Sequence, residues 1–183
     1  TTDRTILTLE DPIEYAISGI TQIPIDTNGG SNYADGLRSV LRLDPDIVMV
    51  GEIRDKDTAR TAIQASITGH LVLSSFHANS TSAAFSRMID LIGTNPIFSS
   101  AIRLVIAQRL VRKLDENKQE YQPDEATRIW VQTVLKGVNS DYLPQDIQGD
   151  FKLWQAVPTV ENPFGYKGRT VIMEQMVVDE NIQ

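Results

Sequence analysis

Polar side chains with the chemistry to bind a metal and a phosphate follow the apolar runs of this chain, where those runs end. Glu10 and Asp11 follow the first run, Glu52 follows the second, and His77 follows the third. In open α/β sheets, ligands bind beyond the carboxyl ends of the strands, which is the edge that these residues would share. A carboxylate there is suited to hold Mg²⁺, directly or through water, and to orient a water molecule for attack on phosphorus. The sequence therefore indicates a metal and phosphate site at one edge of a sheet.

Each of these residues also has an ordinary structural interpretation. Strands commonly end in polar residues that are merely solvated, and agreement among three strands weakens this interpretation without removing it. Arg54 and Arg60 are placed to touch a phosphate, or to form surface ion pairs worth less than about 1 kcal/mol. His70 and His77 would lie on opposite faces of a regular strand, which disfavours a shared metal site. Asp57 is most simply a helix cap.

The elements that must position these residues are strands that alternate with helices. Thr5 to Leu9, Ile47 to Val50 and His70 to Phe76 are short apolar runs bounded by polar or glycine residues, as expected of buried strands. Strands that alternate with helices imply an α/β fold with a mainly parallel sheet flanked by helices. The expected helix caps and ends are Ser31 or Asn32 for the first helix, Asp57 and Gly69 for the second, Gly93 for the end of the third, and Asn95 and Pro96 for the start of a fourth that reaches Ile106.

Composition and charge narrow the class of protein. The chain has 183 residues, 41% of them hydrophobic and 22% charged, which is typical of a folded globular protein. Its net charge of -7 argues against a surface that neutralises many nucleic-acid phosphates. The absence of cysteine excludes disulfides and thiolate metal sites. No apolar stretch approaches the about 20 residues needed to cross a bilayer, and a cytoplasmic location is the simplest expectation.

The character of the chain changes near Asp115, where a polar stretch begins. A helix is expected from about Asp124 to Lys136, with weak strand signals after it. We therefore expect an α/β core over residues 1-114 and a smaller α/β subdomain over residues 115-183. The expected apolar core of the subdomain consists of Trp130, Leu135, Trp154 and Val157.

Three segments resemble the signature boxes of the secretion ATPases that drive type II secretion and type IV pilus assembly. "LRLDPDIVMVGEIRD" (Leu41 to Asp55) resembles the Walker B region, "TLEDPIEY" (Thr8 to Tyr15) the aspartate box, and "TGHLVLSSFHAN" (Thr68 to Asn79) the histidine box. "AQRLVRKL" and "GYKGR", further along the chain, are similar to segments of the assembly ATPases. The resemblance covers about Thr5 to Glu174 and implies a RecA-like ATPase core, here truncated.

The resemblance also implies roles for individual residues. Glu10 would polarise the attacking water, Glu52 would be the Walker B carboxylate acting on magnesium, and His77, with His70, would contact the γ-phosphate. The implied catalytic residues are Glu10, Glu52 and His77, and the implied nucleotide-binding residues are Glu10, Asp11, Glu52, Arg54, His70 and His77, with Glu52 also the magnesium ligand.

For the intact protein, the resemblance implies ATP and Mg²⁺ as cofactors and a homo-hexameric ring. Hydrolysis would power assembly of a type IV pilus or a type II secretion pseudopilus. The implied location is the cytoplasm, peripheral to the inner membrane. The implied partner is an inner-membrane platform protein of a pilus or secretion system, and no nucleic acid is expected.

The sequence departs from the family pattern in two places. No GxxxxGK[ST] loop occurs in the 183 residues, and this loop would cradle the β- and γ-phosphates. We therefore expect an inactive fragment that begins just after that loop and exposes apolar surface. The second departure removes a zinc site, because the positions of the family's two CxxC pairs hold Asp115, Lys118, Pro158 and Glu161. We expect no zinc.

Two other functions remain open on the sequence. One is a non-catalytic oligomerisation or adaptor module on a degenerate ATPase scaffold. The other is a related ring ATPase that moves DNA or a secreted effector.

Overall fold

The chain forms two compact units in the computed structural model, which describes residues 3–94, 96–143, 147 and 151–179. The first unit comprises Thr1–Gln108 and Met173–Gln183, and the second comprises Arg109–Ile172. The sequence-based division gives residues 173–183 to the second part, whereas the contacts group them with the first unit. As functional domains, the ranges 1-114 and 115-183 stay a prediction.

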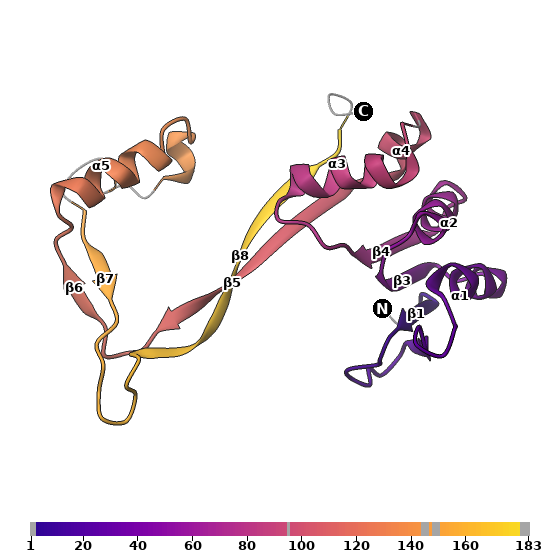
Figure 1. The fold of residues 1–183 in the computed structure, drawn as a ribbon, viewed down its shortest axis with the longest axis horizontal. Coiled ribbons are helices and arrows are strands. Elements are labelled where there is room, and N and C mark those ends of the chain that lie inside the picture. Colours follow the sequence, from indigo (N-terminus) through magenta and orange to yellow (C-terminus); the bar gives the residue numbers. More distant parts are fainter. Residues whose placement is uncertain (1–2, 95, 144–146, 148–150, 180–183) are drawn as a thin grey trace. The chain divides into compact units, whose positions relative to one another are not determined.

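Strands and helices of the first unit build a parallel sheet covered by helices (Figure 1). Its strands occur in the spatial order β2-β1-β3-β4, and all three pairings are parallel. The α/β class expected from the sequence is therefore confirmed. In chain order, the elements are β1 (Ile6–Glu10), β2 (Thr21–Pro24), α1 (Tyr33–Val40), a 3₁₀ turn (Leu41–Leu43), β3 (Ile47–Glu52), α2 (Lys56–Ile67), β4 (Leu71–Ser75), α3 (Thr81–Ile92) and α4 (Pro96–Ala101).

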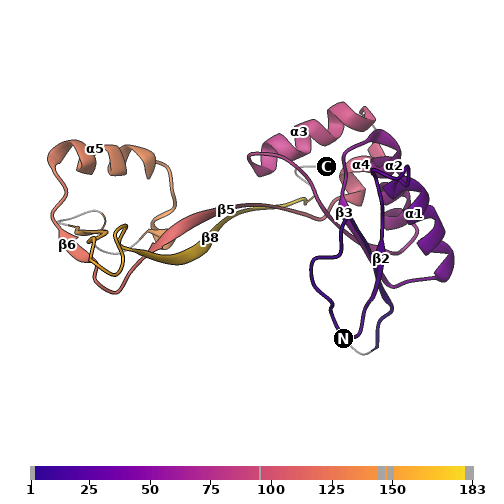
Figure 2. The ribbon, with the colours of Figure 1, turned by 60° about the horizontal axis from the view of Figure 1, so that its bottom comes forward.

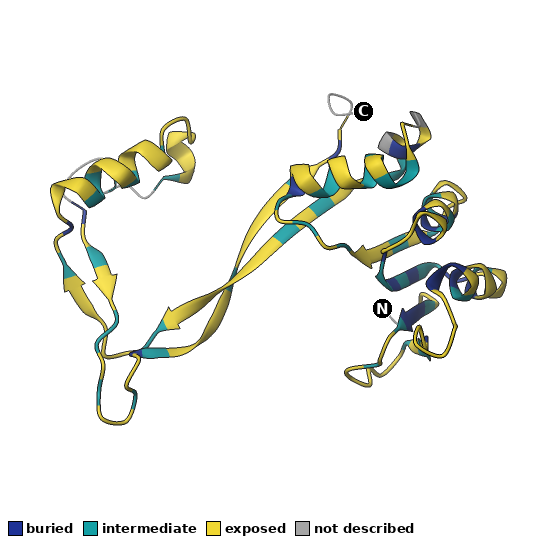
Figure 3. Cartoon of the chain, in the orientation of Figure 1, coloured by how far each residue is buried: buried dark blue, intermediate teal, exposed yellow. Residues whose placement is uncertain are grey.

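The core of the first unit lies where α1 and α2 pack on the central strands. Leu9, Leu37, Val48, Val50 and Ala59 have no exposed surface. Figure 3 shows that buried residues gather in β1, β3 and the inner sides of α1 and α2. Burying one such leucine or valine side chain contributes about 1.5–3 kcal/mol, so this cluster fixes the two central strands against the helices.

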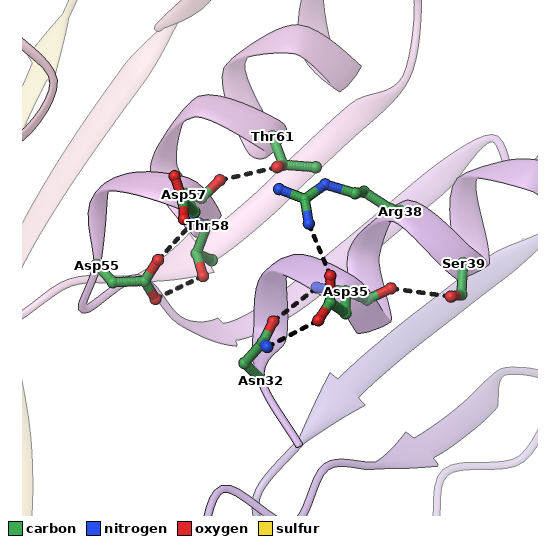
Figure 4. A network of polar contacts seen from close by, with 8 residues as sticks. All are labelled: Asn32, Asp35, Arg38, Ser39, Asp55, Asp57, Thr58 and Thr61. Carbon is green, nitrogen blue, oxygen red and sulfur yellow. Dashed lines mark hydrogen bonds and ion pairs between the residues drawn. The ribbon is translucent and has the colours of Figure 1, made fainter. Parts of the chain in front are cut away.

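Side-chain caps set where α1 and α2 begin (Figure 4). Asn32 Oδ1 accepts from the backbone N–H of Asp35 at 2.8 Å. Asp55 does the same for α2, because its carboxylate accepts from the N–H and the hydroxyl of Thr58 at 2.8 and 2.7 Å. The sequence-based assignment of Asp57 as the cap is therefore wrong. The cap must have extended backbone, which Asp55 has, whereas Asp57 already lies in the first helical turn.

The expected helix that starts at Asn95 and Pro96 is shorter than predicted. It ends at Ala101, and Val105 and Ile106 lie in strand β5 (Leu104–Leu114) instead. Asn95 itself is outside the described residues. The prediction of a helix through Ile106 is wrong because a strand distant in sequence, β8 (Tyr166–Val177), pairs with β5.

Strands β5 and β8 form a two-stranded ribbon (Figures 1 and 2). One end is marked by a hydrogen bond from Val178 N to Arg103 O at 3.0 Å. The other end is marked by a bond from Asp115 N to Gly165 O at 3.0 Å. Since the end of one strand meets the start of the other, the two strands run antiparallel.

The second unit contains an antiparallel pair and one helix. Strands β6 (Gln119–Tyr121) and β7 (Leu153–Gln155) pair, and α5 (Glu125–Val134) begins at its cap Asp124. A 3₁₀ turn spans Ser140–Tyr142. Helix α5 confirms the helix expected from about Asp124 to Lys136.

The expected tryptophan core of this unit is wrong. Trp130 is 65% exposed and Trp154 is 49% exposed, whereas Phe151 is only 2% exposed. The indole of Trp154 lies against Lys118 Nζ, which is 4.7 Å from the ring centroid. Leu135 and Val157 are half-buried.

Candidate active site at the carboxyl edge of the sheet

The strand register brings the predicted acids to one edge of the sheet. Leu9 of β1 pairs with Val50 of β3, so the ends of these neighbouring strands are adjacent. Glu10 is the last residue of β1 and Glu52 is the last residue of β3. Because parallel strands end at a common edge, both carboxylates are delivered to the same rim.

Glu10 is held by two side chains of its own sheet. Gln22 Nε2 donates to Glu10 Oε1 at 2.8 Å, and the hydroxyl of Thr8 donates to the same oxygen. These hydrogen bonds, the one from Gln22 first, hold the pKa of Glu10 below its usual value. Glu10 is therefore ionised at neutral pH, with its position fixed from the side of β2.

Glu52 is more enclosed than the two basic side chains beside it. Its side chain is 16% exposed, and Oε2 lies 2.6 Å from Arg54 Nε and 3.4 Å from His77 Nε2. The side chains of Arg54 and His77 are 67% and 77% exposed, respectively. The largely buried carboxylate is thus flanked on its solvent side by a guanidinium and an imidazole.

The buried phenol of Tyr33 lies next to the strand end that carries Glu52. Tyr33 is 6% exposed and lies on α1. Burial raises the pKa of its phenol, and the charges of Glu52, Asp11 and Glu10 raise it further. One buried group is therefore within electrostatic reach of all three carboxylates.

Asp11 faces the segment that follows β2. Its Oδ2 accepts from the backbone N–H of Thr27 at 3.3 Å and from the Thr27 hydroxyl. Asp11 thus fixes the loop beside Glu10 while it adds a carboxylate to the same edge.

His77 lies just beyond β4 and lines two small pockets. One is about 400 Å³, lined by Ile53, Arg54, Phe76, His77, Arg87 and Leu91. The second is about 330 Å³ and shares Phe76, His77 and Arg87 with the first. The cationic side of the edge therefore holds two arginines and one histidine next to open space.

The structure does not bring His70 to this edge. His70 precedes β4, at the amino end of the sheet, and His77 follows the carboxyl end of the same strand. The ring Nδ1 of His70 lies 3.1 Å from the carbonyl oxygen of Ala65 and 3.2 Å from the hydroxyl of Thr68. Its assignment to the nucleotide site stays a prediction without support from this placement.

The donor set at the edge fits a nucleotide-bound magnesium ion. The carboxylates suit a hard divalent cation, and Arg54 and His77, which lie beside Glu52, suit phosphate oxygens. Among the described residues, no three or more His, Cys, Asp and Glu side chains form a group able to hold a metal ion. Mg²⁺ is compatible with such a site because it is usually held by one or two carboxylates together with phosphates and water.

Sequence reasoning missed four residues of this edge. Thr8 is two positions from Glu10 on one strand, and this spacing was a usable signal because such residues share a face. Gln22, Tyr33 and Arg87 come from other elements, and nothing in their local sequence indicates their proximity to the acids. Only the strand register and helix packing bring them there.

Comparisons with known proteins identify the family of the chain. The family model described as "Type II/IV secretion system protein" matches residues 1–183. The type II secretion system protein E of Pseudomonas aeruginosa is 45% identical over 183 residues, covering 98% of this chain and 34% of the relative. The protein of the same name from Xanthomonas campestris pv. campestris is 41% identical over 186 residues, covering 100% of this chain and 31% of the relative.

Two solved structures are similar in fold. The Legionella pneumophila ATPase DotB aligns with a TM-score of 0.57 at 24% identity, covering 98% of this chain and 38% of DotB, and shows the fold alone. The pilus retraction motor PilT with bound ADP aligns with a TM-score of 0.53 at 35% identity, covering 60% of this chain and 35% of PilT. The fold of the first unit is the RecA-like fold of these secretion ATPases.

The chain belongs to the type II/IV secretion system protein family. It spans about a third of the length of the curated relatives that it matches. Among the described residues, no helix has the length and apolar character needed to cross a bilayer.

Proposed function

We propose that this chain is part of the motor domain of a ring ATPase and supplies the acidic edge of its nucleotide site. The observation that carries the proposal is the parallel register of β1 and β3, which brings Glu10 and Glu52 to one rim of the sheet. The relative named "Type II secretion system ATPase E" in Vibrio cholerae, 42% identical over 184 residues, supports the reaction class. PilT, a solved motor with bound ADP, supports a nucleotide as the ligand.

In the proposed reaction, a water molecule attacks the γ-phosphorus of ATP, the bond from this phosphorus to the β,γ-bridging oxygen breaks, and ADP and inorganic phosphate leave. Glu10, ionised and held by Gln22 and Thr8, orients this water and draws on its proton. Glu52 acts on the magnesium ion, directly or through a bound water. When bound, Mg²⁺ would neutralise part of the negative charge on the phosphates.

The cationic groups of the edge serve the other side of the phosphate. Arg54 and His77 flank Glu52 and are exposed, so a phosphate oxygen can reach both from solvent while they stay beside the carboxylate. A guanidinium such as that of Arg54 forms short, strong hydrogen bonds to phosphate. Catalysis thus comes from positioning and electrostatics, without a covalent intermediate.

The phosphate-binding loop has to come from outside these 183 residues, which contain no GxxxxGK[ST]. Strand β4 is the last strand on its side of the described sheet, and its Leu71 and Leu73 are 53% and 49% exposed. An open strand edge with exposed leucines is suited to pair with a further strand. We place that strand, and the loop that it would carry, in the longer protein.

In the longer protein, we further propose a homo-hexameric ring at the cytoplasmic face of the inner membrane. Its work would be assembly of a pilus or a secretion pseudopilus, with an inner-membrane platform protein as partner. The names of the curated relatives support the secretion system.

The test is ATP hydrolysis by the longer protein, with Glu52→Gln as the variant. We expect nucleotide binding to stay within about threefold and hydrolysis to fall by about 100-fold or more, because the carboxylate acts mainly in the transition state. Glu125→Gln, at an exposed glutamate of α5 that belongs to none of the signature segments, is the matched control. Turnover at the wild-type rate in Glu52→Gln would remove Glu52 from the mechanism.

The rival function is a non-catalytic adaptor, and the missing GxxxxGK[ST] is the observation that favours it. The sequence upstream of residue 1 separates the two. A GxxxxGK[ST] shortly before this segment favours the motor, whereas a longer protein that has no such loop and no ATP hydrolysis is an adaptor.

A further inference from the structure

Arg87 on α3 reaches back to the loop that carries His77. Its Nη1 donates to the backbone carbonyl oxygen of His77 at 2.8 Å. Its Cζ lies 5.6 Å from the ring centroid of Phe76, a distance typical of a cation–π contact. Arg87 thus contacts two successive residues at the end of β4.

The helix that carries Arg87 is itself held at its first turn. Ser80 caps α3, and its hydroxyl accepts from the N–H of Ala83 at 3.1 Å. The carboxylate of Glu174 accepts from the Thr81 hydroxyl at 2.6 Å and from the Thr81 N–H at 3.2 Å. Since Thr81 is 3% exposed, this contact ties α3 firmly to β8 within the first unit. Arg87 therefore extends from a fixed support.

The imidazole of His77 has no such support from burial. Its side chain is 77% exposed, yet Nε2 lies 3.4 Å from Glu52 Oε2. An exposed side chain on a loop samples many rotamers, and motion of its backbone spreads its positions further. The bond from Arg87 restrains that backbone at the residue itself.

We propose that Arg87 is a positioning residue that holds the His77 loop so that the imidazole stays beside Glu52. Arg87 acts through the backbone of His77 and through Phe76. The geometric part of the proposal stands by itself, and only its consequence for hydrolysis rests on the proposed function.

The test uses the 183-residue chain, whose histidines are only two, His70 and His77. The measurement is the change in the NMR resonances of each imidazole ring at one fixed pH when Glu52→Gln is introduced. We expect this change at His77 and not at His70, which lies at the other edge of the sheet. The experiment is then repeated in the Arg87→Met, Arg87→Lys and Arg38→Met backgrounds.

Arg87→Met removes the donor and keeps an apolar stem, so we expect the response of His77 to Glu52→Gln to fall by at least about half. Arg87→Lys keeps a charged donor and should retain most of the response. Arg38→Met removes a guanidinium that pairs with Asp35 on α1 and should leave the response unchanged. An undiminished response in Arg87→Met would overturn the proposal.

A folding defect does not remove the test. If Arg87→Met does not fold, Arg87→Gln, which is too short to replace the guanidinium, is judged by the same criterion. If neither folds, the proposal is also overturned, because a residue that only positions a loop is dispensable to the fold.

Hydrolysis by the longer protein provides the second readout. Arg87→Met should lower kcat by about tenfold and leave KM within about threefold, with partial rescue in Arg87→Lys. If the wild-type longer protein does not hydrolyse ATP, the proposed function fails, while the resonances of His77 still decide the role of Arg87. A wild-type kcat in Arg87→Met would show that the position of His77 does not matter for turnover and would overturn its part in the reaction.

Discussion

Gly51 shows how closely the chain packs next to its candidate metal ligand. A Cβ at this position would lie 2.8 Å from the hydroxyl oxygen of Tyr33 and 3.0 Å from the carbonyl oxygen of Leu9. Glycine is therefore required at position 51, because no side chain fits between β1 and the phenol of Tyr33. It keeps Tyr33 over the strand end that delivers Glu52.

We predict that Gly51→Ala lowers the free energy of unfolding by about 1–3 kcal/mol, the usual cost of an added methyl in a packed site. Part of this lost free energy of unfolding should be recovered when Tyr33→Phe is added to Gly51→Ala, because Tyr33→Phe removes one of the two oxygens that the new methyl group would contact. Urea unfolding of the 183-residue chain measures both. Equal stability of Gly51→Ala and wild type would show that the strand end has room to spare.

At the scale of the element, the start of α2 distinguishes two neighbouring acids that look alike in sequence. Asp55 accepts two hydrogen bonds from Thr58 through its side chain. For Asp57, the bond to Thr61 uses its backbone carbonyl instead, as Figure 4 shows. Only Asp55 is a cap, so removing the two side chains should lower the free energy of unfolding by unequal amounts.

We predict that Asp55→Ala destabilises the first unit by about 1 kcal/mol, because one helix-end N–H loses its partner. Asp57→Ala is the matched control and should cost a few tenths of that, through the helix dipole alone. Thermal or urea unfolding followed by helical circular dichroism measures the difference. A larger loss of stability in Asp57→Ala than in Asp55→Ala would show that Asp57 is the cap.

The open edge of β4 leads to a prediction on association. Leu71 and Leu73 are exposed on the last described strand of the sheet, and such edges pair with other chains. We expect the 183-residue chain to self-associate at micromolar concentration and the Leu71→Lys, Leu73→Lys double variant to do so less. Leu43→Lys, at an exposed leucine outside β4, is the control. Sedimentation that is identical for all three chains would contradict this use of the edge.

The elements that sequence reasoning predicted well are those with a local cause. Asn32, one of the two expected caps of the first helix, caps it through its own side chain, and the helix expected from about Asp124 begins at that residue. The β5 strand was misjudged because Val105 and Ile106 suit a helix or a strand equally, and their partner β8 lies far along the chain. Tertiary pairing, which local sequence does not record, made the choice.

At the scale of the whole molecule, carboxylates in both units accept hydrogen bonds that favour their charged forms. The pKa values of Glu10, Asp46, Asp55, Asp115, Asp124 and Glu174 are all held below the usual range. For Glu174 the main cause is the hydroxyl of Thr81, and for Asp115 it is the amide of Asn162. Each such group stabilises the folded chain more when it is ionised.

We therefore predict acid destabilisation of the chain. A folded-state pKa below the unfolded one means that the stabilisation is complete above about pH 4.5, the usual value for glutamate. It is lost progressively as the pH falls through the lower, folded values. Unfolding free energies measured between neutral and acid pH test this, and Glu174→Gln should weaken the dependence. A stability that rises on acidification would contradict the assigned bonds.

The candidate site was predictable from the sequence only in part. The acids at the ends of β1 and β3 follow from short apolar runs that stop at a carboxylate, and the parallel register then brings them together. The supporting residues Gln22, Tyr33 and Arg87 come from separate elements, and their contacts arise from packing. The sequence thus predicts which groups reach the edge, and the fold decides what holds them there.

The most direct test of the central claim is a double-mutant cycle on ATP hydrolysis by the longer protein, with Glu10→Gln, Glu52→Gln and the two combined. If both carboxylates work in one site, each single variant should lose about 100-fold or more, and the combined variant little more than the worse single one. Losses that multiply in the combined variant, or single variants within about twofold of wild type, would contradict a shared site at this edge of the sheet.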